Sequence, residues 1–229
     1  MVTALAAFDV DGTLLKGHIW RALIKYHRER KMKRLFLWLF ALIHYPLWFL
    51  AKSGLWDEVR FRTKWMEDFA GIFKGLKRGE IRDILSAVLE NELEPEIRAD
   101  LLDTLKEHQA KNHMVVLVSG TFEDLLRLLG EKIGVEHVLG TRVEFREGRC
   151  TGRVMGSACM GSEKVRRIQE LINERGLEVD LPSSFTYADS ISDLPLLEWV
   201  GNPVAVEPEE KLQAIAQERG WQIMEPEGE

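Results

Sequence analysis

The 229-residue chain is poor in cysteine, and this scarcity limits what kind of protein it can be. Its two cysteines, Cys150 and Cys159, form no C-x-x-C pair and stand beside no histidine cluster. A disulfide framework or a zinc site is therefore not expected. Two isolated thiols fit a reducing compartment, and we expect a cytoplasmic protein.

The chain also lacks an excess of positive charge. Its formal net charge is -6, so no general attraction to nucleic acid is expected. No basic segment precedes the short apolar run that ends at Asp9, and we therefore expect no signal peptide. The composition, 45% hydrophobic and 30% charged, is that of a globular protein with a core of ordinary size.

Four short apolar runs predict buried parallel strands, three of them directly followed by polar residues. They span residues 3–8, 114–118, 184–188 and 203–206. Helical patterns stand between or after them, at 96–109 (with Pro95 at its start), 122–129, 162–175, 194–200 and 209–219. This alternation predicts a doubly wound α/β fold. A small β-hairpin is expected at 141–153, and a frayed acidic tail at 225–229.

The stretch from Ile19 to about Leu93 breaks the alternation, because it contains only helical patterns. We therefore predict two parts. Residues 1–17 and 94–229 would form the α/β core, and residues 18–93 would form an all-helical cap inserted after the first strand.

Polar side chains follow three of the predicted strands, at the edge where open α/β sheets bind ligands. They are Asp9 and Asp11, Ser119 and Gly120, and Asp189 and Asp193, with Lys164 near the start of the helix before the third strand. Four carboxylates in one pocket repel each other unless a cation joins them, and a hard ion such as Mg²⁺ prefers oxygen ligands. One carboxylate could then attack phosphorus while a second transfers protons. Mg²⁺ and Lys164 would offset charge on the transferring phosphoryl group.

Four motifs in this order resemble the haloacid dehalogenase-like (HAD) superfamily. They are Asp9-Val10-Asp11-Gly12-Thr13-Leu14, Val118-Ser119-Gly120-Thr121, Lys164, and Ala188-Asp189-Ser190-Ile191-Ser192-Asp193. The helical insert and the hairpin are similar to those of its phosphoserine-phosphatase-like subgroup, subfamily IB. The resemblance implies a Rossmann-like core, a cap that closes over the substrate, and hydrolysis of a phosphomonoester through a phospho-aspartate intermediate.

The same resemblance implies a role for each matching residue. Asp9 would be the nucleophile and Asp11 the general acid and base, while Ser119, Gly120 and Lys164 would hold the phosphoryl group. The ligands of Mg²⁺ would be Asp9, the backbone carbonyl of Asp11, Asp189 and Asp193. His18 stands seven residues after Asp11, where phosphoserine phosphatases carry a Glu that receives the substrate ammonium. We expect His18 either at the leaving group or at the cap hinge.

The substrate is open at this point. Besides His18, the fourth motif departs from those enzymes, because it ends Ser-Ile-Ser-Asp where they have Gly-Ala-Asn-Asp. A small metabolite, phosphoserine-like or histidinol-phosphate-like, is the first prediction, and a phosphatidylglycerophosphate-like lipid is the alternative. A phosphotransferase and a non-enzymatic, membrane-associated binding module are the other hypotheses. Arg60, Arg62 and Lys64 in the cap are expected on a solvated face.

Residues 35–51 form an apolar run of 17 residues without a formal charge, between basic residues on both sides. A membrane-spanning helix needs about 20 apolar residues, and His44 and Pro46 interrupt the run. A buried hairpin inside the cap is the first prediction. The alternatives are a peripheral membrane anchor, with Trp38 and Trp48 at the lipid headgroups, and a true span.

Overall fold

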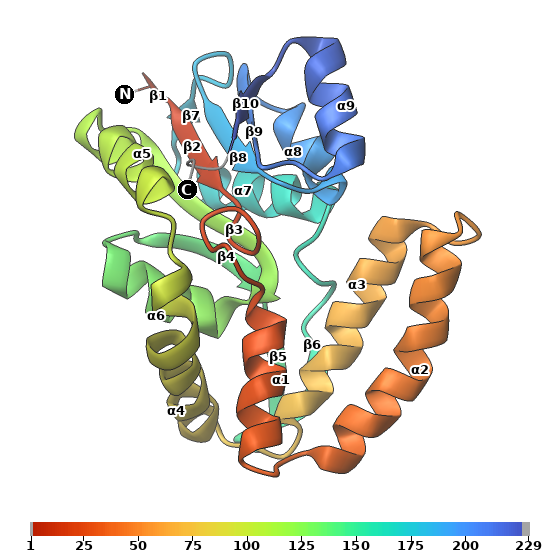
Figure 1. Cartoon of the computed structure of the whole chain (residues 1–229). Coiled ribbons are helices and arrows are strands. Elements are labelled where there is room, and N and C mark those ends of the chain that lie inside the picture. Colours follow the sequence, from red (N-terminus) through yellow and green to blue (C-terminus); the bar gives the residue numbers. More distant parts are fainter. Residues whose placement is uncertain (1, 226–229) are drawn as a thin grey trace.

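The computed structural model describes residues 2–225, and its upper half is a parallel β-sheet flanked by helices (Figure 1). The sheet has six strands in the order β10-β9-β8-β2-β3-β4, and every neighbouring pair is parallel. The strands are β2 (Leu5–Phe8), β3 (Met114–Phe122), β4 (His137–Thr141), β8 (Phe185–Ala188), β9 (Asn202–Val206) and β10 (Gln222–Met224). This is the predicted doubly wound α/β fold.

Side chains of the central strand β2 alternate between the two faces of the sheet, and all of them are buried. Ala6 and Phe8 pack on the side of α5 and α6, whereas Leu5 and Ala7 pack on the side of α7 and α8. The helices of the core are α5 (Ala99–Ala110), α6 (Glu123–Ile133), α7 (Ser162–Glu174), α8 (Leu194–Leu197) and α9 (Glu210–Arg219). Because both faces of β2 are covered, its run of apolar residues is continuous rather than alternating.

Some boundaries differ from the sequence prediction. The edge strands β4 and β10 were not predicted, nor were the short strands β1 (Val2–Thr3) and β7 (Glu178–Val179), which pair with each other. The helix expected from residue 96 begins at Ala99, because Pro95 lies in a separate 3₁₀ turn, Glu94–Glu96. Apart from Glu225, the tail predicted to fray lies outside the residues that the structure describes.

The lower half of the molecule is a layer of helices that lies below the carboxyl ends of the strands (Figure 1). It contains α1 (Ile19–Glu29), α2 (Arg34–Lys52), α3 (Glu58–Phe69), η1 (Ala70–Phe73), α4 (Arg78–Val88) and η2 (Leu89–Leu93). Phe69 stacks on Phe122 of β3 with ring centroids 6.1 Å apart, and Phe73 meets the same ring edge to face at 4.9 Å, so these contacts join the layer to the core. The exact division of the chain at residues 17/18 and 93/94 stays a prediction.

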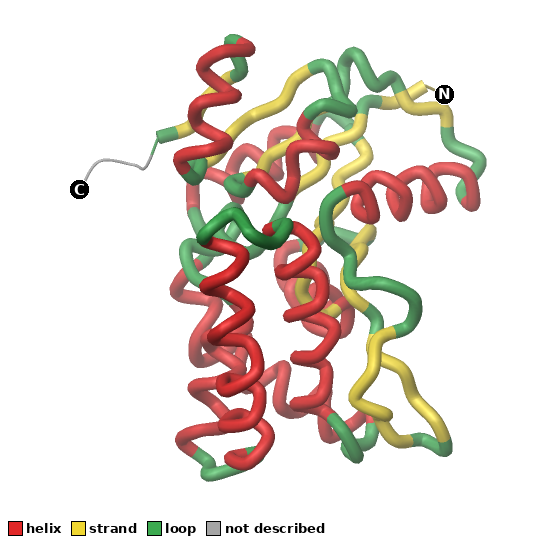
Figure 2. The backbone as a smooth tube through the Cα atoms, turned by 90° about the vertical axis from the view of Figure 1, so that its right-hand side faces the viewer, coloured by secondary structure: helices red, strands yellow, loops and turns green. Residues whose placement is uncertain are grey.

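The predicted hairpin is present as β5 (Val143–Arg146) and β6 (Arg149–Val154), which pair antiparallel. Its strands reach down beside the helical layer (Figure 2), where β6 packs against η1 and α3. The backbone N–H of Cys150 donates to the carbonyl of Leu76, and the N–H of Gly75 donates to the carbonyl of Cys150. The hairpin therefore supports the helices although it lies far from them in the sequence.

The prediction of a buried hairpin at residues 35–51 was wrong. These residues form the single helix α2, which continues through Pro46. Of its 19 residues only Phe40, His44 and Ala51 are buried. Pro46 lies on an exposed stretch, so water can satisfy the carbonyl that loses its helical partner there. By length and composition, α2 is the one helix within residues 2–225 that could cross a membrane.

Candidate active site

Three carboxylates meet at the edge of the sheet that faces the helical layer. Asp9 directly follows β2, Asp189 directly follows β8, and the 3₁₀ turn Ile191–Asp193 carries Asp193 back toward both. One oxygen from each of these carboxylates lies within 4.8 Å of the others. Since parallel strands end at the same edge, residues 180 positions apart in the chain become neighbours.

Lys164 lies between two of these carboxylates and is itself buried, with a side chain only 3% exposed. Its Nζ is 2.7 Å from Oδ1 of Asp9 and 2.6 Å from Oδ1 of Asp193. Burial alone would lower the pKa of Lys164, but the charges of Asp193 and Asp9 outweigh it and raise the pKa. The cluster thus holds one permanent positive charge against three acidic groups.

Thr13 connects the strand ends, a role that the sequence did not reveal although Thr13 stands in the first motif. Its Oγ1 lies 3.2 Å from Oδ2 of Asp9 and 3.0 Å from Oδ1 of Asp189. One hydroxyl has a single proton to donate, so it can satisfy only one of these oxygens at a time. The other oxygen needs a proton or a cation. Burial and the charges of Asp9 and Asp193 accordingly raise the pKa of Asp189 above its ordinary value.

Asp11 lies in the loop after β2, and its Oδ1 accepts a hydrogen bond of 2.6 Å from the backbone N–H of Ile19, the first residue of α1. Burial raises the pKa of Asp11 to about 7, even though the Ile19 N–H and the charge on Lys164 act in the opposite direction. A carboxyl group that titrates near neutral pH can both hold and release a proton. This geometry suits a general acid and base.

The remaining predicted residues lie around the same cleft. Ser119 is buried within β3 and accepts a 3.3 Å hydrogen bond from the backbone N–H of Thr121. Gly120 follows it, and a Cβ there would lie 2.4 Å from the methyl group of Met160. His18 precedes α1 and stacks on Trp20. Burial, together with Arg21 and Arg62, lowers the pKa of His18, which favours the neutral form of its ring.

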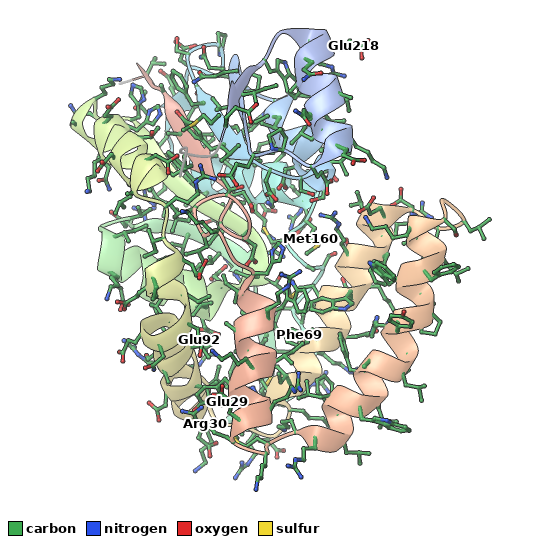
Figure 3. The ribbon with its side chains drawn as sticks, in the orientation of Figure 1. Glu29, Arg30, Phe69, Glu92, Met160 and Glu218 are labelled. Carbon is green, nitrogen blue, oxygen red and sulfur yellow. The ribbon has the colours of Figure 1, made fainter. Side chains whose placement is uncertain are left out.

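The cleft has a volume of about 790 Å³ and lies between the strand ends and the helical layer. Figure 3 shows Met160, one of its lining residues, at the junction of the two halves. All eight predicted site residues line it: Asp9, Asp11, His18, Ser119, Gly120, Lys164, Asp189 and Asp193. The opposite wall is aromatic, formed by Trp20, Phe40, Tyr45, Trp48, Phe61 and Trp65. Sequence reasoning did not identify this wall, because aromatic residues in helices usually indicate core packing alone.

The prediction of a solvated face was wrong for Arg62, whereas Arg60 and Lys64 are exposed. Arg62 donates to Oγ of Ser190 at 2.6 Å and to Oε2 of Glu209 at 3.0 Å, and so ties α3 to the core beside the cleft. Helix geometry could have signalled this difference. Residues four apart share a helix face, but a residue two positions away points to the opposite side.

Gly12 has to be a glycine for two reasons. Its φ is +86°, in the region that L-residues rarely adopt. A Cβ at this position would also lie 2.4 Å from Oδ2 of Asp189, well inside van der Waals contact. The turn after Asp11 therefore allows the Asp189 carboxylate to approach the backbone of the first loop.

A doubly wound sheet with buried carboxylates and a lysine at its carboxyl edge defines a class of α/β proteins whose acidic site suits a cation. Within that class the assignment is direct: residues 6–198 match the haloacid dehalogenase-like hydrolase model, and the chain belongs to this family.

Two named relatives and one solved structure are similar to this chain. The chain is 30% identical to phosphoserine phosphatase SerB1 of Mycobacterium tuberculosis over 97% of this chain and 70% of that one. It is 31% identical to a histidinol-phosphatase of Neisseria meningitidis over 52% of this chain and 55% of that one. A crystal structure of a protein of unknown function from Bordetella pertussis Tohama I superposes with a TM-score of 0.81. Its sequence is 26% identical, and the match covers 98% of this chain and 99% of that chain.

Proposed function

We propose that the protein is a Mg²⁺-dependent phosphomonoesterase that forms a phospho-aspartate intermediate on Asp9. The observation that carries this proposal is the cluster of Asp9, Asp189 and Asp193, in which Lys164 pairs with Asp9 and Asp193. Family membership and the names of the two relatives support phosphate ester hydrolysis. The two buried free cysteines fit the reducing cytoplasm that we propose as its compartment.

The donor set fits Mg²⁺. Asp9, Asp189, Asp193 and the backbone carbonyl of Asp11 would offer oxygen atoms only, which a small hard cation prefers. Burial, with the charge on Asp9, raises the pKa values of Asp189 and Asp193, so ionising both carboxylates calls for added positive charge. Bound Mg²⁺ would supply it and would offset the negative charge of the phosphoryl group.

The reaction has two steps. In the first, a carboxylate oxygen of Asp9 attacks phosphorus, the bond between phosphorus and the ester oxygen breaks, and Asp11 protonates the departing alkoxide. In the second, Asp11 takes a proton from water, the water oxygen attacks phosphorus, and phosphate and free Asp9 are released. Lys164 and Ser119 hold the phosphoryl oxygens in both steps, where charge stabilisation counts most.

A small phosphorylated metabolite, phosphoserine-like or histidinol-phosphate-like, is the substrate class we propose first, on the names of the relatives. His18 has a lowered pKa, so a neutral ring would meet the leaving group, unlike the Glu of phosphoserine phosphatases. The aromatic wall of the cleft specifically favours a second candidate, the headgroup end of a lipid phosphate. In both cases residues 18–93 would act as the cap over residues 1–17 and 94–229.

Phosphate release from a panel of esters tests this function. We expect Mg²⁺-dependent hydrolysis of p-nitrophenyl phosphate, followed by a clear preference among phosphoserine, histidinol phosphate and detergent-dispersed phosphatidylglycerophosphate. Analysis of products with added alcohol separates hydrolysis from phosphoryl transfer. If the folded protein binds Mg²⁺ but cleaves none of these esters, the enzymatic proposal fails and a binding module takes its place.

Gly12→Ala is expected to lower turnover far more than the conformational strain of the alanine alone predicts. The φ of +86° costs an alanine about 1–2 kcal/mol, and the new Cβ would in addition displace the Asp189 carboxylate. Gly75→Ala is the matched control, because Gly75 has the same φ of +86° and nothing within 4 Å of its Cβ position. Thermal unfolding and turnover are measured for both variants. Equal losses of turnover would show that the approach of Asp189 to Gly12 is unimportant.

A further inference from the structure

The outer face of α2 is apolar and exposed to solvent. Leu35, Trp38, Leu39, Leu42, Ile43, Tyr45, Trp48, Phe49 and Leu50 are all exposed large hydrophobic residues on this one helix. Among residues 2–225 only Val2, Leu55 and Met155 are exposed in the same way outside α2, so exposed apolar surface is concentrated here. A soluble domain rarely leaves a patch of this kind without a partner. Figure 1 places α2 at the outer edge of the helical layer.

A basic cluster lies at one end of this face. The end of α1 and the turn into α2 carry Arg28, Arg30, Lys31 and Arg34, all exposed. None of these four forms an ion pair with another residue of the described chain, and Figure 3 shows Arg30 at the far end of α1. The side chain of Arg30 instead lies over the ring of Tyr26. Lys31 has a φ of +57°, a backbone conformation that glycine adopts more easily than lysine. The turn therefore holds a charged residue despite the conformational cost.

The charge pattern selects one kind of occupant. Between residues 34 and 52 α2 contains no Asp or Glu, so a second copy pairing through this helix would bring no counter-charge from α2 itself. Anionic lipid headgroups would supply that charge. Trp38, Tyr45 and Trp48 are the amphipathic aromatic side chains that favour the boundary between headgroups and acyl chains.

The packing of α2 fits a helix that lies on the surface of a bilayer better than one that spans the bilayer. The inner side of α2 is held to α3, because the rings of Phe40 and Trp65 meet edge to face, with centroids 5.2 Å apart, and His44 Nε2 lies 3.2 Å from Oδ2 of Asp68. A spanning helix would have to leave both contacts. An interfacial helix needs to bury only its outer face, which is the part that α2 leaves exposed.

We propose that the outer face of α2, together with the basic cluster of Arg28, Arg30, Lys31 and Arg34, docks this protein on an anionic lipid surface. Tyr45 and Trp48 belong to this face and also line the cleft. Docking therefore places the mouth of the cleft beside the headgroups. The proposal concerns the surface alone and holds whether the cleft hydrolyses soluble or lipid phosphates.

Vesicle flotation tests the proposal. The purified protein should float with vesicles of phosphatidylcholine containing about 30% phosphatidylglycerol, and much less with phosphatidylcholine alone. The variant Leu42→Gln/Phe49→Gln should bind at least about tenfold more weakly, because two exposed side chains can no longer enter the interface. Met155→Gln is the control for removing an exposed apolar side chain, since Met155 is 56% exposed but lies outside α2, whereas Leu42 is 57% exposed.

A second pair of variants tests the charges. Lys31→Gln/Arg34→Gln should weaken binding and reduce its salt dependence, whereas Lys106→Gln/Lys111→Gln removes the same charge from exposed positions at α5 and should not. None of the changed residues lines the cleft, so hydrolysis of p-nitrophenyl phosphate should stay at the wild-type rate in every variant. Activity thus reports on the catalytic proposal separately from docking.

Three results would overturn docking. The wild-type protein could fail to float with anionic vesicles. Alternatively, the Leu42→Gln/Phe49→Gln variant could float as well as the wild-type protein does. Size-exclusion chromatography without lipid could instead show a dimer that this variant dissociates, which would make a second copy the occupant of the face.

Discussion

Asp9→Asn is expected to lower kcat by at least about a thousandfold, equivalent to roughly 4 kcal/mol of lost transition-state stabilisation. An amide oxygen is a poor nucleophile toward phosphorus, so the covalent step would fail although the substrate could still enter the cleft. The fold should tolerate the change. Lys164 would keep its ion pair with Asp193 at 2.6 Å, and one of three mutually repelling carboxylates would be gone.

Turnover of p-nitrophenyl phosphate and acid quenching with a radiolabelled ester measure this prediction. The wild-type protein should carry label that hydroxylamine removes, as an acyl phosphate requires, and the Asp9→Asn variant should carry none. Asp103→Asn is the matched control, because Asp103 is 73% exposed on α5 and lies far from the cleft. Wild-type turnover in the Asp9→Asn variant, or label on another residue, would refute the nucleophilic role.

Parts of the fold that depend on local pattern could be predicted from the sequence. The apolar runs that became β2, β3, β8 and β9 are buried on both faces, and such runs differ clearly from amphipathic helices. The strand β10 could not be found in this way, because it is three residues long and only half-buried. Its pairing with β9 depends on the position of α9, which is a tertiary property.

The acidic half of the site was predictable and the aromatic half was not. Asp9 and Asp189 directly follow β2 and β8. Because parallel strands end at the same edge of a sheet, their proximity could be predicted from the sequence. Trp65 and Phe40 are helical residues whose orientation depends on how α2 and α3 pack together. The hydrophobicity of residues 35–51 suggested burial, but hydrophobicity alone does not tell whether the partner of a helix is the protein core or another phase.

Removal of divalent cations is expected to abolish turnover, and addition of Mg²⁺ should restore it, because the proposed reaction requires positive charge among Asp9, Asp189 and Asp193. The same cation should stabilise the fold. At a concentration about one hundred times its Kd, Mg²⁺ adds about 2.7 kcal/mol to the free energy of unfolding. In a chain of this length that corresponds to a rise in Tm of roughly 5–10 °C. Asp189→Asn should lose most of this rise, and Asp103→Asn should keep it.

The stabilisation by Mg²⁺ should grow with pH. Burial, helped by the charge on Asp9, raises the pKa of Asp193 to about 6 despite Lys164, and Asp11 reaches about 7. Without the cation the folded state therefore binds more protons than the unfolded state between about pH 4 and pH 7. The contribution of these two groups to the free energy of unfolding accordingly falls as pH rises through that window. Mg²⁺ competes with those protons for the ionised carboxylates. The rise in Tm on adding Mg²⁺ should thus be larger at about pH 8 than at about pH 5, and calorimetry with and without chelator measures both. An equal rise at the two pH values would mean that the cation binds elsewhere.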